Sequence, residues 1–385
     1  MSRRLAARWA AVALLLSLVA APQGALAASR HTGSGTTSIW TVVPSPDTGG
    51  GDDPVAVAAT SSTDAWIVGD RFDIGTNHYL TLIEHWNGTA WSVVPSTSPR
   101  AFNWLYGVSA ISPTNAWAVG FSNNDTWGTN KTLVLHWDGS KWSIVPSPNP
   151  KTESELFSVV AVAPNNVWAV GATYSGGVRA TLVERWDGTR WSVVPSPNAG
   201  TYDGLFGVAA DPSGGLWAVG AGYFNTSPDT RTVVLHWDGS AWKLVKSPNP
   251  NDDNYLDRAA AVSSTDVWAV GDQLDQSYNE QSLIEHWNGT SWTVVAAPAT
   301  GAELRTAAAV SSTDVWAVAT SQAGKTLTER WDGTKWSVVA SPNVGTGFNS
   351  LEGVAALPTG EVWAVGTYDS GASGSRTLIL HTTRG

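Results

Sequence analysis

Acidic and aromatic side chains gather in the parts of this chain that differ most between its repeated units. Carboxylates can bind cations or transfer protons, and exposed aromatic rings can stack on sugars or pack against a protein partner. Rigid scaffolds usually carry their binding sites on such variable connections, although ordinary solvated loops remain an alternative for each residue. The candidate ligand-binding residues are Asp52, Asp53, Trp104, Tyr106, Trp127, Tyr174, Tyr202, Asp203, Tyr223, Phe224, Asp252, Asp253 and Tyr278.

Recognisable catalytic patterns are absent from the sequence. It contains no Gly-x-Ser-x-Gly, no His-Glu-x-x-His, no phosphate-binding glycine loop and no cysteine. The carboxylates around Asp52, Asp203 and Asp252 could serve as acid and base, as in a propeller hydrolase or lyase, or could bind Ca²⁺ weakly. We therefore predict a binding protein without a cofactor or a dedicated metal site, and we keep an enzyme as the alternative.

A basic residue stands at the same position of every repeat, and in all but the last repeat a tryptophan follows it. One imidazole per repeat does not provide the clustered ligands that a metal site needs. We expect each base to bond a neighbouring carbonyl or the Asp or Asn of the following turn. These residues are His85, His136, Arg185, His236, His286, Arg330 and His381.

The residue before this base alternates between glutamate and leucine, which indicates a partly buried position. The segment Thr-x-x-Glu-Arg/His-Trp-Asp-Gly-x-x-Trp resembles the hairpin of fungal and bacterial fucose-binding propeller lectins. The resemblance implies that the glutamates hold a sugar between repeats, together with a Trp and an Arg of the preceding strand. Ala or Ile stands where those lectins carry the Arg. The glutamates are Glu84, Glu184, Glu285 and Glu329.

Seven copies of Trp-Ala-Val-Gly or a close variant define the elements that must position these residues. Each repeat has four short runs rich in Val, Leu, Trp and Thr, and a Trp-Asp/Asn-Gly turn separates the last two. This pattern predicts an all-β, seven-bladed β-propeller with four antiparallel strands per blade, similar in architecture to kelch and Asp-box propellers. The predicted blades span 54–98, 102–148, 155–197, 204–248, 255–299, 303–342 and 350–382 together with 38–46.

The two ends of the array each hold part of a repeat. The segment 40–46 matches the last strand of the other repeats, and Thr377-Leu-Ile-Leu-His381 ends where that strand should follow. An N-terminal strand that completes the last blade predicts a closed ring.

Residues 1–27 have the charged start, apolar run and Ala25-Leu-Ala27 site of a secretory signal peptide, and residues 28–37 form a polar lead that we expect to be flexible. Removal of the predicted signal peptide, residues 1–27, changes the formal charge from −10 to about −13, which argues against nucleic acid and anionic membranes as partners. No further stretch predicts membrane insertion. We expect an extracellular protein.

Three functions are possible for the face of the propeller that carries the variable connections. Binding of an extracellular glycan is favoured. A protein-interaction scaffold is the first alternative and predicts an apolar patch formed by Trp104, Tyr106, Phe121 and Trp127. An enzyme is the second, and predicts carboxylates with perturbed pKa values that converge over the channel. The sequence leaves the oligomeric state open.

Overall fold

The computed structural model describes residues 39–46, 48–124, 129–223, 229–275, 277, 279–298, 301–371 and 374–382. All regular structure in these ranges is β-strand. No helix in these ranges has the length and apolar character needed to cross a membrane. The predicted signal peptide and the lead at 28–37 lie outside the described residues.

The strands follow each other through short connections. The first half of the chain contains β1 (Trp40–Val43), β2 (Gly51–Ser61), β3 (Asp64–Asp73), β4 (His78–Trp86), β5 (Trp91–Val93), β6 (Phe102–Ser112), β7 (Asn115–Asn123), β8 (Lys131–Trp137), β9 (Trp142–Ile144), β10 (Glu153–Ala163), β11 (Asn166–Ser175), β12 (Val178–Trp186) and β13 (Trp191–Val193). The second half contains β14 (Gly204–Ala210), β15 (Leu216–Tyr223), β16 (Thr230–Trp237), β17 (Trp242–Val245), β18 (Asp253–Ser263), β19 (Asp266–Leu274), β20 (Glu280–Trp287), β21 (Trp292–Val294), β22 (Glu303–Ser311), β23 (Asp314–Thr320), β24 (Thr326–Trp331), β25 (Trp336–Val339), β26 (Gly353–Ala356), β27 (Val362–Asp369) and β28 (Ser375–Thr382).

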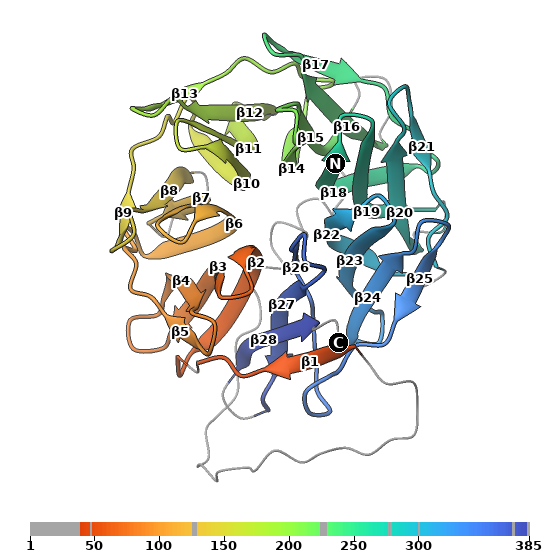
Figure 1. Ribbon diagram of the computed structural model, residues 1–385. Coiled ribbons are helices and arrows are strands. Elements are labelled where there is room, and N and C mark those ends of the chain that lie inside the picture. The colour runs from red at the N-terminus through yellow and green to blue at the C-terminus, as the bar shows by residue number, and fades with distance from the viewer. Residues whose placement is uncertain are drawn as a thin grey trace.

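These strands form five sheets of four strands and one of eight. The eight-stranded sheet consists of two antiparallel groups, β2–β5 and β6–β9, which are joined by one parallel residue pair between Tyr79 and Phe102. Each four-stranded group, called a blade below and identified by its first strand, stands radially in a ring (Figure 1). The first strands β2, β6, β10, β14, β18, β22 and β26 form the inner wall of this ring.

The predicted ring closure is confirmed. β1 pairs with β28 in antiparallel register from Trp40 opposite Thr382 to Val43 opposite Ile379, and it completes the sheet β1-β28-β27-β26 (Figure 1). The Trp40 side chain is 3% exposed and contacts Trp316 edge to face at 5.2 Å. The N-terminal strand therefore contributes both backbone pairing and core packing.

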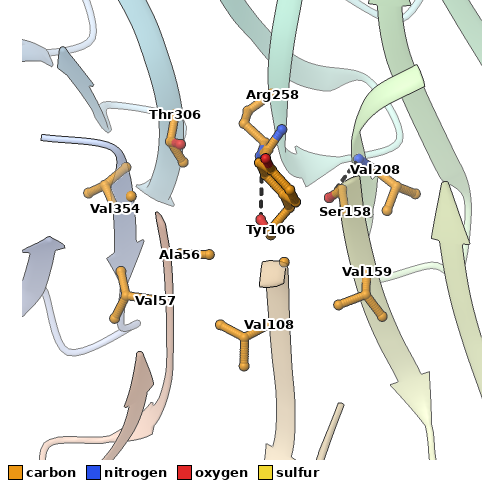
Figure 2. A pocket seen from close by; sticks show the side chains of 12 residues that line it. Ala56, Val57, Tyr106, Val108, Ser158, Val159, Val208, Arg258, Thr306 and Val354 are labelled. Atoms are coloured by element: carbon orange, nitrogen blue, oxygen red, sulfur yellow. Dashed lines mark hydrogen bonds between the residues drawn. The ribbon is translucent and has the colours of Figure 1, made fainter. Parts of the chain in front are cut away.

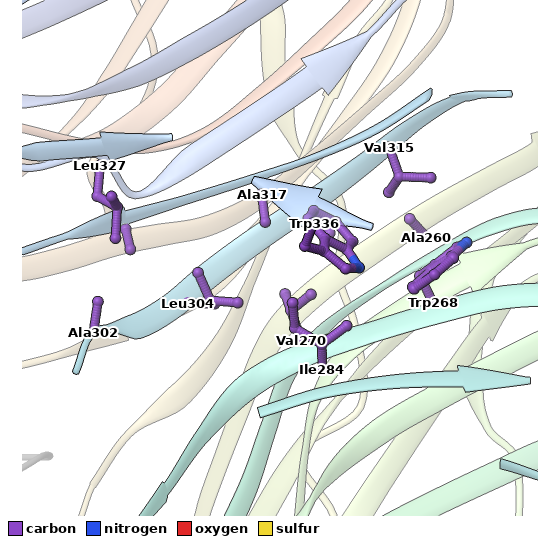
Figure 3. Packing of buried hydrophobic residues seen from close by; sticks show 12 residues of the cluster. Ala260, Trp268, Val270, Ile284, Ala302, Leu304, Val315, Ala317, Leu327 and Trp336 are labelled. Atoms are coloured by element: carbon purple, nitrogen blue, oxygen red, sulfur yellow. The ribbon is translucent and has the colours of Figure 1, made fainter. Parts of the chain in front are cut away.

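Tryptophans hold neighbouring blades together. The hairpin pair Trp137 and Trp142 face each other across β8 and β9, as predicted, and both contact Trp66 of the preceding blade at 5.0 and 5.2 Å. Trp268 and Trp336 repeat this contact in the cluster of Figure 3. The strand-two Trp is thus the central member of each interblade core, because its side chain is almost fully buried in every blade.

Some first strands begin earlier than the sequence predicted. β2 starts at Gly51, three residues before the predicted first blade at 54–98, and β6 starts at Phe102. A β-bulge at Tyr106 shifts the register between Leu105 and Gly107, and regular pairing continues on its other side. Asp53, which lies outside the predicted blades, is therefore held on a strand, as is Trp104.

Candidate binding site at the channel mouth

Each first strand carries a bulged residue at the same level of the channel. The strand pairings shift register at this position in six blades, and Glu352 takes the corresponding place directly before β26. The resulting bulge ring consists of Val55, Tyr106, Phe157, Phe206, Asp257, Arg305 and Glu352.

One arc of the bulge ring is aromatic. Tyr106, Phe157 and Phe206 come from consecutive blades, with ring centroids 5.7 Å apart for the first pair and 6.0 Å for the second. Phe121 stacks on Tyr106 at 5.4 Å, and Trp104 packs against Phe121 at 5.1 Å. The sequence-predicted patch of Trp104, Tyr106 and Phe121 is therefore present, while Trp127 lies outside the described residues.

The opposite arc is charged. Arg305 contacts Glu303 at 2.5 Å and Glu352 at 3.4 Å. Burial raises the pKa of the Glu352 carboxyl, and Arg305 opposes this effect. Carboxylate oxygens of Asp257, Asp272 and Glu303 lie within 4.8 Å of one another and could hold a cation, but Arg305 already brings a positive charge to this group.

Arg258 crosses the channel below the bulge ring. Its guanidinium donates a hydrogen bond to the carbonyl oxygen of Tyr106 at 3.2 Å (Figure 2). It also donates to the carbonyl oxygens of Phe157 at 3.3 Å, of Asp257 at 3.0 Å and of Phe206. One side chain therefore joins the β18 blade to three others. The remaining cavity has a volume of about 140 Å³ and is lined mainly by small or aliphatic residues such as Ala56, Val108, Val159 and Val354.

A buried arginine extends the aromatic arc towards the β14 blade. Arg179 lies 3.7 Å from Glu155, and its guanidinium is placed over the rings of Phe157, Tyr202 and Phe206 at 5.8 to 5.9 Å. Desolvation raises the pKa of the Glu155 carboxyl although Arg179 lowers it. Two further candidates join this cluster, because Tyr174 and Tyr223 each pack against Tyr202.

Several predicted site residues have structural roles instead. Asp52 is fully buried and accepts a hydrogen bond from Thr48. Asp203 is also fully buried and accepts the amide of Gly200 at 2.8 Å. Asp253 accepts the amide of Thr230 at 2.7 Å. Asp252 is exposed, and Phe224 and Tyr278 lie outside the described residues.

The lectin-like glutamates are buried more deeply than we expected. All four have no exposed surface, as do the leucines at the same position of the other blades. The carboxyl of Glu84 accepts hydroxyl hydrogen bonds from Ser45 at 2.9 Å and Thr377 at 3.1 Å, both on the neighbouring β26 blade. The glutamate therefore faces an interblade core, and the structure gives no support for a sugar at this position.

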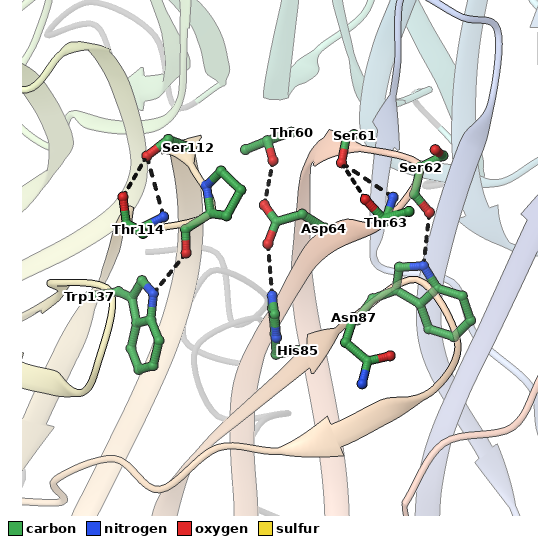
Figure 4. A network of polar contacts seen from close by, with 12 residues as sticks. Thr60, Ser61, Ser62, Thr63, Asp64, His85, Asn87, Ser112, Thr114 and Trp137 are labelled. Atoms are coloured by element: carbon green, nitrogen blue, oxygen red, sulfur yellow. Dashed lines mark hydrogen bonds and ion pairs between the residues drawn. The ribbon is translucent and has the colours of Figure 1, made fainter.

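The row of bases is structural, as predicted, but its partners differ from those expected. His85 bonds Asp64 at 2.7 Å (Figure 4), and His136 bonds Asn115 at 3.0 Å. These partners stand at the start of the second strand rather than in the Trp-Asp-Gly hairpin. The base also packs on the strand-two Trp, with 4.1 Å between the rings of His85 and Trp66.

Sequence reasoning missed most of the channel mouth. Each bulged residue lies at a constant spacing before the strand-two Trp, and aligning the repeats on that Trp would have revealed the position. The residues missed at the mouth are Asp70, Phe157, Arg179, Phe206, Asp257, Arg258, Arg305 and Glu352.

No protein-family model matches the chain. No curated protein matches it in sequence. Solved structures do match in fold: "YCF48 bound to D1 peptide" has a TM-score of 0.57 and 14% identity over 91% of this chain and 98% of that one. YCF48 from Cyanidioschyzon merolae has a TM-score of 0.55 and 17% identity over 90% of this chain and 99% of that one. A chain of the Mitotic Checkpoint Complex has a TM-score of 0.57 and 12% identity over 94% of this chain and 100% of that one.

The radial four-stranded sheets, the closure by β1 and these structural matches define the class of the protein. The chain is a β-propeller. At identities this low, the likeness concerns the fold alone.

Proposed function

We propose that this protein is a seven-bladed propeller that binds a polypeptide at the channel mouth. The number seven rests on splitting the eight-stranded sheet at its single parallel pair, Tyr79 with Phe102, which leaves two blades beside the five other sheets. The predicted signal peptide supports action after export from the cytoplasm.

The observation that carries the proposal is the aromatic arc of Tyr106, Phe157 and Phe206. Tyr106 and Phe206 are partly exposed at the mouth, whereas Phe157 is 4% exposed and supports them from between. Aromatic anchors above a rigid core are typical of protein-binding hot spots. A structural neighbour is described as bound to the D1 peptide, which supports a polypeptide as the kind of partner that this architecture accepts.

A charged arc beside the aromatic arc would add specificity. Asp257, Arg305 and Glu352 are partly exposed on the other side of the same ring. A polypeptide that crosses the mouth would meet apolar and charged surfaces in turn, whereas the aromatic rings mostly contact each other and leave little open face for a sugar.

Peptide selection tests the proposal. Peptides are selected from a random display library on the purified chain, and the affinities of synthetic copies are measured by isothermal titration calorimetry. We expect Phe206→Ala to weaken binding at least about tenfold. Phe348→Ala is the matched control, because Phe348 is 52% exposed and lies outside the arc. Equal effects of the two substitutions, or binding only to sugars on a glycan array, would overturn the proposal.

A further inference from the structure

Two aspartates face each other at the edge of the channel mouth. Asp53 on β2 and Asp70 on β3 are direct partners in the antiparallel register. Directly opposed residues project from the same face of a sheet. Val68, two residues before Asp70 and therefore on its face, packs with Leu105 of the β6 blade. The carboxyls of both aspartates therefore lie on the side of the β2 blade that faces the β6 blade.

Neither carboxyl has a hydrogen-bond or ion-pair partner among the residues that the structure describes. This is unusual for Asp70, which is only 4% exposed. Burial of a carboxylate without a partner is costly, and other buried aspartates avoid this cost. Asp64, for example, is 3% exposed and contacts His85 at 2.7 Å. Asp53 is partly exposed, so the pair is open to solvent on one side.

Aromatic rings surround the pair. Tyr79 follows on β4, and its ring lies 5.8 Å from that of Trp104 on β6. Asp70 and Asp53 both contribute to raising the pKa of Tyr79 and of Tyr106, beside the larger effect of burial. The negative charge of the pair therefore reaches both phenols, and the side-chain cluster combines two carboxylates with three electron-rich rings.

We propose that the cluster of Asp53, Asp70, Tyr79, Trp104 and Tyr106, called the pocket below, binds a primary ammonium group of the polypeptide, from a lysine side chain or a free N-terminus. This inference rests on the proposed function and names the group that the mouth recognises. An ammonium group supplies the missing donors to both carboxylates and is attracted to aromatic faces.

A metal ion fits the pocket less well. Ca²⁺ takes six to eight oxygen ligands, and Mg²⁺ requires octahedral oxygen coordination. Two carboxylates beside aromatic rings would leave most ligand positions of either ion to water, whereas an ammonium group can use both the carboxylates and the ring faces. The chain's acidic balance of 32 Asp and Glu against 22 Lys and Arg also favours a cationic partner.

Protonation gives the proposal a pH signature. Burial and then Glu352 raise the pKa of Asp53 to about 7, although the positive charge of Arg305 opposes them, and burial together with Asp53 and Asp52 raises the pKa of Asp70. The empty pair therefore holds a proton near neutral pH, and a bound ammonium group must displace it. Affinity should increase as pH rises from 6 to 8.

Small amines test the pocket separately from peptide binding. The purified chain is titrated at pH 7, where both amines are mainly protonated, with Nα-acetyl-lysine methylamide and with glycine methylamide, and Trp fluorescence is recorded. Binding of either compound supports the proposal, and the tighter one identifies the lysine side chain or the N-terminal amine as the source. We expect Asp70→Asn and Asp53→Asn each to weaken binding of the tighter amine at least about tenfold. Asp252→Asn, which removes an exposed charge outside the pocket, should have no effect on that affinity.

The outcomes separate the two proposals. The ammonium site would be overturned if neither amine bound, or if Asp70→Asn left the amine affinity unchanged. Tighter binding of Ca²⁺ than of the amines in the same titration would also overturn it. In each of these cases peptide binding that depends on Phe206 would leave the proposed function intact. Absence of both amine binding and peptide binding would overturn the ammonium site and the proposed function together. Asp70→Asn replaces a buried carboxyl whose pKa is raised by burial with a neutral isostere, so its folding, checked by circular dichroism, should be preserved.

Discussion

Arg258 on β18 donates a hydrogen bond from Nη2 to the carbonyl oxygen of Tyr106 on β6, at 3.2 Å across the channel. The bulge at Tyr106 breaks the regular register of β6 at this residue. Small residues occupy the position of Arg258 on the other first strands, so among the first strands only β18 places a long side chain in the channel at that level. They are Ala56, Gly107, Ser158, Gly207, Thr306 and Gly353.

Removing this guanidinium should destabilise the ring. Arg258→Met keeps much of the side-chain volume but loses the hydrogen bonds to Tyr106, Phe157, Phe206 and Asp257, so we expect a loss of about 3 kcal/mol or more in the free energy of unfolding. Urea denaturation measures the change. Arg231→Met is the control, because the Arg231 side chain is 33% exposed and its guanidinium bonds Asp229, a near neighbour in the same blade, at 3.3 Å. Similar midpoints for both variants would show that Arg258 does not join the blades energetically.

The closing strand is equally open to test. Deletion of residues 38–46 removes all pairing to β28 and exposes its edge, so the melting temperature should fall sharply. Trp40→Ala should cost about 3–5 kcal/mol, because this side chain is buried against Trp316. Deletion of residues 28–37 serves as the control. A parental melting temperature after loss of β1 would mean that the ring does not depend on this closure.

The sequence predicts the parts of this fold that local pattern and repetition determine. The Trp-Asp-Gly turns are an example, since Gly139 has the positive φ of 92° that a tight hairpin needs. The closure was also predictable, because the segment that begins at Trp40 has no repeat before it. What could not be read from one repeat is which side chains from different blades meet.

The bulges explain this limit. One extra residue at Tyr106 or Val55 changes which neighbours share a face, and simple alternation cannot show it. The pairing of Asp53 with Asp70 depends on that register, so Asp53 was recognised only as an acidic residue of a link, and Asp70 was missed. The Arg258 contacts join residues that are far apart in the sequence and leave no local pattern.

Two buried glutamates should make the protein less stable at alkaline pH. Desolvation raises the pKa of Glu184 and Glu285 to about 8, and neither carboxyl has a hydrogen-bond partner among the described residues. The unfolded chain loses these protons near pH 4.5 and the folded chain only near 8, so this stabilising contribution is complete below pH 4.5 and is lost as pH rises through 8.

Leucine, which three other blades carry at this position, should remove this dependence. We expect the double variant Glu184→Leu, Glu285→Leu to melt at a higher temperature than the parent at pH 8, with the difference shrinking towards pH 5. Glu84→Leu is a matched comparison, because it leaves the hydroxyls of Ser45 and Thr377 without their acceptor and should gain less. A constant difference across this pH range would contradict the assigned pKa values. Differential scanning calorimetry at several pH values provides the measurement.

The hairpin aspartates should determine stability at the acidic end. In each of these turns the Asp accepts hydrogen bonds from the hydroxyl and amide of the residue two positions later and from the next amide, as Asp138 does from Ser140 and Lys141. These bonds lower the pKa of each carboxyl to about 2. The four residues are Asp138, Asp187, Asp238 and Asp332.

The pH dependence of stability from these aspartates has the opposite sign to that from the buried glutamates. A lowered pKa gives stability that is present above the unfolded value of 3.8 and is lost as pH falls through 2. Asn87 and Asn288 make the same bonds in two other hairpins without titrating, so the protein contains its own control. Replacing all four aspartates by asparagine should leave the melting temperature at pH 6 nearly unchanged and flatten its decline between pH 4 and 2. An acid transition identical to that of the parent would show that these turns do not set the acid limit, and that carboxyls elsewhere in the ring do.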